Sequence, residues 1–96
     1  MAQVKFLGKL REITGVITEE VESSQVRQVL ERLTERFGPE LSELLFPPEN
    51  GAELSGDIQI LVNGRNIGFL DGLDTDLEPE DRITILYHGA RGYPGG

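Results

Sequence analysis

The sequence predicts an α+β fold of two layers, in which one main helix packs on one face of a mixed sheet of about four to five strands. Three observations support this prediction. Short segments of alternating apolar residues lie near both ends of the chain, a single long amphipathic pattern lies between them, and an Asn-Gly pair follows the most regular of these segments. The 96 residues are enough for one domain with a modest core, or for one domain and a tail.

The N-terminal part is expected to form two strands and the helix. Residues Gln3–Gly8 form the first strand, and Val16–Val21 forms the second strand after a turn region. The helix is expected to begin at an N-cap of Ser23 or Ser24 and to end at Gly38, which precedes a proline. Its apolar residues recur at helical spacing and form one stripe: Val26, Val29, Leu30, Leu33 and Phe37.

The C-terminal part is expected to supply the remaining strands. Residues Pro39–Phe46 form one or two more helical turns, and Asp57–Asn63 is the most regular strand of the chain. The Asn63-Gly64 pair predicts a tight hairpin turn, because both central residues of a type I′ turn need a positive φ, and Arg65–Phe69 is the returning strand. After an acidic, irregular segment, Arg82–His88 forms the last strand, which could pair in parallel with the first. The leucines expected to point inward from these segments are Leu41, Leu44, Leu45, Leu73 and Leu77.

Alternation along the strands separates a core face of the sheet from an opposite face. The core face is expected to carry Val4, Phe6, Ile58, Ile60, Val62, Ile83, Ile85 and Tyr87, and the opposite face Lys5, Leu7, Gln59, Leu61, Thr84, Leu86 and His88. Because the chain has one long helix, we expect the opposite face to be exposed, so that Leu7, Leu61 and Leu86 form an apolar patch for a partner if their strands are adjacent. Two alternatives stay open: residues 39–46 cover part of this patch, or the leucines are isolated surface residues without a function.

The composition excludes several classes of function. The formal net charge is −8, with 17 acidic and 9 basic residues, which argues against binding to nucleic acid or to an anionic membrane surface. The absence of cysteine excludes disulfides, thiolate metal sites and a cysteine nucleophile, and it fits a cytoplasmic protein. With one histidine and none of the common nucleotide-binding or hydrolase motifs, we expect no catalytic residue and no bound metal or cofactor.

Two polar features have both a structural and a functional interpretation. A lone histidine is more often a surface or packing residue than a catalyst, and we expect this of His88 at the end of the last strand. Its place beside the tail also makes it a candidate for a partner interface. The acidic residues between Leu70 and Asp81 do not fit the spacing of a calcium-binding loop that starts at Asp71 or Asp74. They are expected to form a solvated loop, which could still dock on a basic partner.

The end of the chain is the remaining candidate for chemistry. Four of the 12 glycines lie at positions 89, 92, 95 and 96, so residues 89–96 are expected to form a flexible tail after a domain of residues 1–88. Because Gly95 and Gly96 have no Cβ, the terminal carboxylate can enter a narrow channel of another enzyme and reach the α-phosphate of ATP. A sulfur donor or an amine can then displace AMP from the resulting acyl-adenylate. The alternative is a frayed end without a role.

Several motifs resemble, in their order and spacing, those of the β-grasp sulfur carriers and ubiquitin-like modifiers. They are most similar to MoaD, the small subunit of molybdopterin synthase, and to its archaeal-type relatives, with ThiS more distant. The segments that carry the resemblance are Val4–Leu7 with Leu10–Ile13, Leu61–Ile67, Leu70–Leu77 with Asp81–Ile85, and the terminal Gly95-Gly96. The chain departs from the MoaD pattern in its tail, which is longer and has one proline, and in the longer segment of residues 47–56.

The resemblance implies a ubiquitin-like β-grasp fold and a protein without catalytic activity of its own. It implies that an ubiquitin-activating-type enzyme adenylates Gly96 with Mg-ATP, and that the terminus is then converted to a thiocarboxylate. The tail residues that would enter a partner's channel are Arg91, Gly92, Tyr93, Pro94 and Gly95. Partner contacts in this family use apolar residues on the open sheet face, which match Leu7 and Leu86 here.

Three functions follow as hypotheses. The first is a sulfur carrier for molybdenum- or tungsten-pterin cofactor synthesis, with the large subunit of molybdopterin synthase or another sulfur acceptor as its second partner. The second is a protein modifier that is joined through Gly96 to lysines of target proteins. The third is an interaction module of the same fold whose tail takes part in no chemistry.

Overall fold

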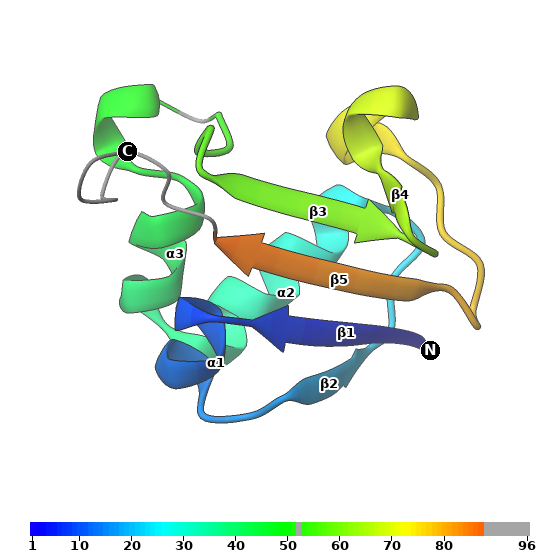
Figure 1. The fold of residues 1–96 in the computed structure, drawn as a ribbon, viewed down its shortest axis with the longest axis horizontal. Helices are drawn as coiled ribbons and strands as arrows, with labels where there is room; N and C mark the ends of the chain where they lie inside the picture. The colour runs from blue at the N-terminus through cyan, green and yellow to red at the C-terminus, as the bar shows by residue number, and fades with distance from the viewer. Residues whose placement is uncertain (52, 88–96) are drawn as a thin grey trace.

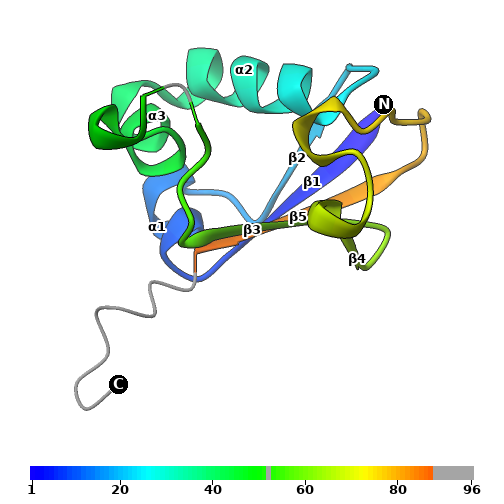
Figure 2. The same cartoon turned by 90° about the horizontal axis from the view of Figure 1, so that it is seen from above.

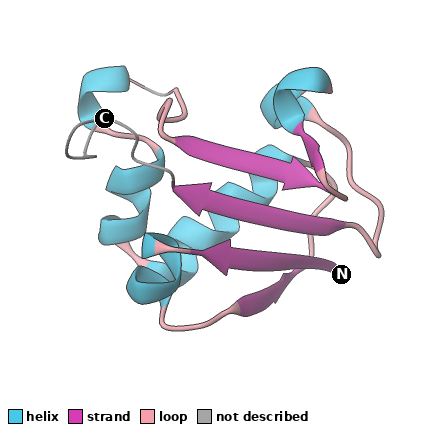
Figure 3. Ribbon diagram, in the orientation of Figure 1, coloured by secondary structure: helices cyan, strands magenta, loops and turns pink. Residues whose placement is uncertain are grey.

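The computed structural model describes residues 1–51 and 53–87, which form one mixed five-stranded sheet with helices packed against it (Figure 1). The strands are β1 (Ala2–Leu7), β2 (Thr18–Val21), β3 (Ile58–Val62), β4 (Arg65–Asn66) and β5 (Arg82–Tyr87). The α-helices are α1 (Lys9–Thr14), α2 (Val26–Phe37) and α3 (Pro39–Leu45), and short 3₁₀ helices cover Pro48–Asn50, Ile67–Phe69 and Gly72–Asp74. This arrangement confirms the predicted α+β fold with one main helix (Figure 3).

The sheet has the strand order β2-β1-β5-β3-β4, so the first and last strands of the chain lie at its centre. β1 and β5 pair in parallel, which the sequence left open, and Leu7 lies opposite Leu86 in their register. β5 pairs antiparallel with β3, and β1 pairs antiparallel with β2. Parallel neighbours need a long crossover connection, and here α2 lies in that connection and covers the sheet (Figure 2).

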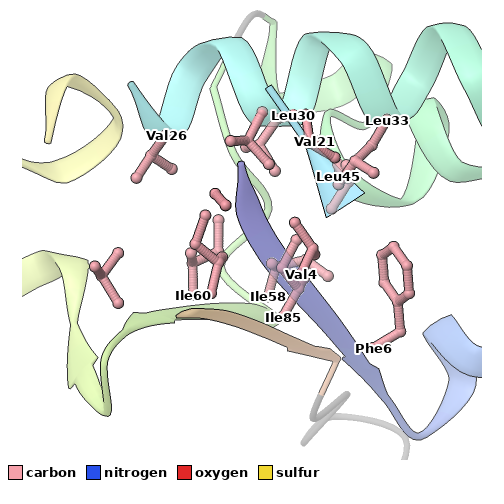
Figure 4. Close-up of a cluster of buried hydrophobic side chains, with 14 of the residues drawn as sticks. Val4, Phe6, Val21, Val26, Leu30, Leu33, Leu45, Ile58, Ile60 and Ile85 are labelled. Carbon is pink, nitrogen blue, oxygen red and sulfur yellow. The ribbon is translucent and has the colours of Figure 1, made fainter. Parts of the chain in front are cut away.

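The hydrophobic core lies between one face of the sheet and the helices (Figure 4). The first four residues of the predicted stripe of α2 are fully buried, and Phe37 is half-buried, with its ring edge-on to Phe6 at a centroid distance of 5.8 Å. The residues predicted on the core face of the sheet are buried, except for Tyr87, which is half-buried against the cluster. Burial of such side chains contributes roughly 1.5–3 kcal/mol each before entropy is counted, so the alternation of the strands fixes which face meets the helices.

Helix α3 belongs to the same layer as α2. Leu41 and Leu45 are buried in the core, and Leu44 packs against it, as predicted. Figure 2 shows α2 and α3 on the same side of the sheet. The alternative in which residues 39–46 cover the opposite face is therefore wrong.

The start of α2 differs from the prediction. An N-cap at Ser23 or Ser24 is wrong, because the N-cap is Gln25, whose side chain makes no capping hydrogen bond. The first N–H of the helix donates instead to the carbonyl of Thr75 at 3.1 Å, so a loop satisfies a group that a serine would otherwise cap. Ser24 donates from its backbone N–H and its hydroxyl to Oε1 of Gln28, both at 3.2 Å, and thereby holds the segment that enters the helix.

The segment predicted as a turn after the first strand contains a helix. Gly8 at φ 63° precedes α1, and Gly15 at φ 76° ends it with its N–H donating to the carbonyl of Arg11. Leu10 is fully buried, so α1 adds one side chain to the core and leads from β1 to β2. The connection between these strands is therefore longer and more ordered than a simple hairpin turn.

Two strands are shorter than predicted, whereas the hairpin turn is confirmed. β2 begins at Thr18, and β4 contains only Arg65 and Asn66. β4 ends early because Oδ1 of Asn66 accepts a hydrogen bond from the N–H of Gly68 at 2.8 Å, which turns the chain into a 3₁₀ helix. Asn63 and Gly64 have φ values of 53° and 85°, as a type I′ turn requires.

The acidic segment before β5 is tied to the start of α2. The N–H of Leu77 donates to the carbonyl of Ser24 at 2.9 Å, and the Leu77 side chain is buried, as predicted. Arg27 forms an exposed ion pair with Asp74 at 3.0 Å. In the described part of the chain, no group of three or more His, Cys, Asp or Glu residues is placed to hold a metal ion, and no helix has the length and apolar composition that crossing a bilayer requires.

Candidate functional site

The predicted site has two parts, the open face of the sheet and the chain end, and the structure describes the first. Strand β5 ends at Tyr87, and nine residues follow it to Gly96 in the sequence. The tail and its neighbour lie outside the described residues: His88, Arg91, Gly92, Tyr93, Pro94, Gly95 and Gly96. The geometry of the site is therefore that of the sheet from which the tail begins.

Three leucines come together on the face of the sheet opposite the helices. Leu7 of β1 lies directly opposite Leu86 of β5 in the parallel register. On the other side of β5, Leu86 pairs with Gln59 and Leu61 pairs with Thr84, so Leu61 is the diagonal neighbour of Leu86. Side chains at directly opposite and diagonal positions of neighbouring strands are within about 8 Å of each other. The strands are thus adjacent, as the predicted apolar patch required, and all three leucines are half-buried.

The same face is polar and cationic at one end of the strands and apolar at the other. Towards the start of β5, a hollow is lined by polar and positively charged residues together with Ile83: Gln3, Lys5, Asn63, Gly64, Arg82 and Thr84. In the register, Gln3 pairs with Arg82 and Lys5 pairs with Thr84. Leu7 and Leu86 lie next along the same strands, towards the end from which the chain continues to Gly96. The open face therefore has a cationic end far from the tail and an apolar end beside it.

None of the acidic residues lies on the three central strands. All 17 aspartates and glutamates are elsewhere, whereas β1 contributes Lys5 and β5 contributes Arg82. In a chain with a formal charge of −8, this leaves the centre of the sheet as an apolar and cationic surface. Such a surface fits a partner with an apolar contact and nearby carboxylates.

The last described residue is anchored to the folded domain. Tyr87 packs against the core cluster, and Nζ of Lys9 lies 5.6 Å from the centroid of its ring, which is the geometry of a cation–π contact. The tail therefore starts from a fixed point at the edge of the leucine patch. The sequence predicted the three leucines and assigned Lys5 to their face. It did not predict the contact of Lys9 with Tyr87, because that contact depends on α1, which was not expected.

The described residues offer an apolar and cationic face of the sheet beside the point where β5 ends. Comparisons with known proteins show the family and the fold of the chain. The sequence pattern of the ThiS family matches residues 4–90. A candidate sulfur carrier protein of Archaeoglobus fulgidus is 32% identical over 72 residues, which cover 75% of this chain and 78% of that protein.

Two solved structures show the same fold. The solution structure of small archaeal modifier protein 1 from Methanosarcina acetivorans is similar with a TM-score of 0.83, at 34% identity and with 93% of each chain covered. A chain in the crystal structure of the BexX/CysO complex of Amycolatopsis orientalis is similar with a TM-score of 0.79, at 23% identity and with 100% of each chain covered. At the latter identity the similarity shows the fold alone.

Proposed function

Because the chain belongs to the ThiS family of sulfur carriers and ubiquitin-like modifiers, we propose that it is a sulfur carrier that acts through the carboxylate of Gly96. The main support is the position of an ordered apolar face directly beside the point from which the glycine-ended tail continues. Leu7 and Leu86 pair on this face, and Tyr87 follows Leu86 in the chain. A partner that binds the face is then close to the start of the tail and can receive the terminus.

The proposed reaction uses this chain as the substrate of another enzyme. The terminal carboxylate attacks the α-phosphate of ATP, releases pyrophosphate and forms an acyl-adenylate. A sulfur nucleophile then attacks the carbonyl carbon and displaces AMP, which leaves a thiocarboxylate on Gly96. The activating enzyme supplies Mg²⁺, ATP and the catalytic groups, and the chain supplies the docking face and an end without side chains.

The carrier would next deliver its sulfur to an acceptor enzyme. We propose molybdenum- or tungsten-pterin cofactor synthesis as the pathway, with a molybdopterin synthase large subunit as the acceptor, because the Leu61–Ile67 hairpin and the approach to β5 resemble the MoaD pattern. The same leucine face would serve the activating enzyme and the acceptor in turn, since both need the terminus. The BexX/CysO complex is a precedent for a chain of this fold that is bound to another protein.

The proposal is tested by the intact mass of the purified chain after incubation with the activating enzyme of its source organism, Mg-ATP and a sulfide donor. We expect one terminal oxygen to be replaced by sulfur. The mass of a variant with one alanine added after Gly96 should stay unchanged. Its carboxylate lies one residue beyond the position that the activating enzyme aligns with ATP, and it belongs to a residue that has a Cβ. The matched control carries the alanine at the N-terminus and should react normally. Reaction of the C-terminally extended variant without trimming would contradict the proposal.

A second function is favoured by one observation. The solved structure that is 34% identical to this chain is that of a modifier protein. In that case the amine of a target lysine, and not sulfur, would displace AMP and form an isopeptide bond with Gly96. Adducts of high mass in cells of the source organism, which disappear when Gly96 is deleted, would support this function. If neither a thiocarboxylate nor adducts form, the tail takes part in no chemistry.

A further inference from the structure

A single aromatic side chain stands out from the surface at the far end of the sheet. Phe69 is 84% exposed, the most exposed large hydrophobic residue in the described part of the chain. The other three phenylalanines are buried or packed against the core: Phe6, Phe37 and Phe46. Full burial of an aromatic ring is worth roughly 1.5–3 kcal/mol, so this exposure leaves a substantial binding contribution unused within the chain.

The backbone around Phe69 is held in place by its neighbours. Ile67 is buried and Leu70 packs against the core, while the N–H of Leu70 donates to the carbonyl of Ile67 at 2.9 Å. Oδ1 of Asn66 accepts a hydrogen bond from Gly68 at 2.8 Å and fixes the start of the turn. The two flanking apolar residues thus point inward and Phe69 points outward. Because the backbone that carries the ring is already ordered before binding, an interface does not have to order the turn, which lowers its entropic cost.

The chemistry around Phe69 specifies the kind of partner. Between Ile67 and Asp81 the chain has six acidic residues and no basic one. Asp71, two residues after Phe69, is exposed, and Asp76 is exposed in a hollow that Arg65 and Leu70 also line. An aromatic anchor is buried best in an apolar pocket, and carboxylates at the rim are complementary to lysines and arginines. This combination is the opposite of that on the open face of the sheet, where the leucines lie beside Lys5 and Arg82.

The position of Phe69 separates it from the tail. β3 pairs with β5 from Ile58 opposite Tyr87 at one end to Val62 opposite Ile83 at the other, and Phe69 follows the β3–β4 hairpin at this second end (Figure 1). The two ends of the paired region are about 13 Å apart at the usual rise of a strand. Leu61 of the leucine patch pairs with Asn66 at this second end, whereas Leu7, Leu86 and Tyr87 lie at the first end. A protein bound at Phe69 is therefore nearer to Leu61 than to the start of the tail.

We propose that Phe69, with the carboxylates of Asp71 and Asp76, is a second docking site that binds a basic amphipathic helix of a partner protein, whose apolar face covers the ring and whose lysine and arginine side chains meet the carboxylates. The site lies away from the Leu7–Leu86 pair, so it can be occupied while another protein holds that pair and the chain end. It does not depend on the chemistry proposed for Gly96. Its role is to keep one partner attached while the tail passes between others.

The first experiment titrates the isotopically labelled full-length chain with a synthetic amphipathic helix of leucine and lysine. We expect amide chemical-shift changes centred on residues 66–76. Phe69→Ser should lower the affinity about tenfold, the effect of removing a hot-spot aromatic. Asp71→Asn with Asp76→Asn should lower it and reduce its dependence on salt. The matched control is Ile17→Ser, which removes an apolar side chain that is 51% exposed elsewhere on the surface and should leave binding unchanged.

Several results would overturn the proposal. They are shifts centred on Leu7 and Leu86, equal affinity of the Phe69→Ser variant, and shifts that appear on concentrating the chain without peptide, which would identify a second copy as the occupant. In a second experiment, p-benzoylphenylalanine replaces Phe69 in cells of the source organism, with position 17 as the control. The protein that is cross-linked only at position 69 should, once purified, bind the wild-type chain and not Phe69→Ser. Absence of such a protein also overturns the proposal, whereas failure of Gly96 to form a thiocarboxylate does not affect it.

Discussion

At the scale of single residues, Asn63 acts through both its backbone and its side chain. Its φ of 53° completes the hairpin turn with Gly64. Its side chain also joins the turn to the start of β5, since Nδ2 donates to Oδ1 of Asp81 and Oδ1 accepts from the N–H of Arg82, both at 2.9 Å. Asp81 in turn accepts from the N–H of Glu78 at 2.8 Å through its other oxygen. The turn was predicted from the Asn-Gly pair alone, whereas these contacts join residues far apart in the sequence and follow only from the fold.

Two substitutions at Asn63 separate its backbone role from its side-chain role. Asn63→Gly keeps an easy positive φ and removes both hydrogen bonds, so we expect the free energy of unfolding to fall by about 1–2 kcal/mol. Asn63→Ala removes the same bonds and adds the cost of a Cβ in the left-handed region, so it should be less stable than the glycine variant by roughly another 1 kcal/mol. Urea unfolding followed by circular dichroism measures both values. Equal stability of the two variants would show that the positive φ carries no cost here.

At the scale of elements, length and periodicity decided what the sequence could predict. The stripe of α2 spans 12 residues, and the alternation of β3 and β5 is regular, so these elements and their buried faces were predicted correctly. α1 has six residues, too few for a helix to form without tertiary support, and it depends on burial of Leu10 between distant segments. The N-cap of α2 was missed for a related reason, because a loop carbonyl of Thr75 replaces the side-chain cap.

In the candidate site, too, the features that depend on local sequence were predicted and those that depend on the whole fold were not. Alternation assigned Leu7, Leu61 and Leu86 to one face, because side-chain direction in a strand is a local property. That Leu7 meets Leu86 depends on the parallel register of β1 and β5, which is set by the packing of the whole core and not by either strand. Phe69 was predicted as part of a returning strand, and its exposure follows from the early end of β4 at Asn66.

Adjacent residues of β5 provide a test at this scale. Ile85 is buried and Leu86 is half-buried on the opposite face. Ile85→Ala should lower the free energy of unfolding by about 2–4 kcal/mol through lost burial and a cavity, and Leu86→Ala by less than about 1 kcal/mol. Leu86→Asp should keep the fold, seen by circular dichroism, and lose binding to the activating enzyme, measured by calorimetry. If Leu86→Ala costs as much as Ile85→Ala, then Leu86 is a core residue and the docking face is misassigned.

At the scale of the whole molecule, the charge distribution distinguishes two surfaces. The acidic residues occupy the helices, the loops and β2, and the central strands carry only Lys5 and Arg82 as charged residues. Although Glu20 of β2 lies opposite Gln3, a partner with carboxylates meets positive charge on this face only at the central strands. The summed field can therefore orient the chain before contact and direct the partner to the face beside the tail.

Charge reversal on the open face should consequently act on the rate of association. We expect Lys5→Glu and Arg82→Glu each to slow binding to the activating enzyme about fivefold at low salt, with little change in the dissociation rate, because steering acts mainly before docking. Arg32→Glu is the matched control, since it makes the same change of charge at an exposed position of α2 on the helix side. Stopped-flow mixing at two ionic strengths gives the rates. The difference in association rate between the open-face variants and the Arg32→Glu control should shrink as salt shortens the Debye length to about 3 Å at 1 M. If Arg32→Glu slows association as much as Arg82→Glu does, net charge and not its placement controls the encounter, and the open face does not orient the chain.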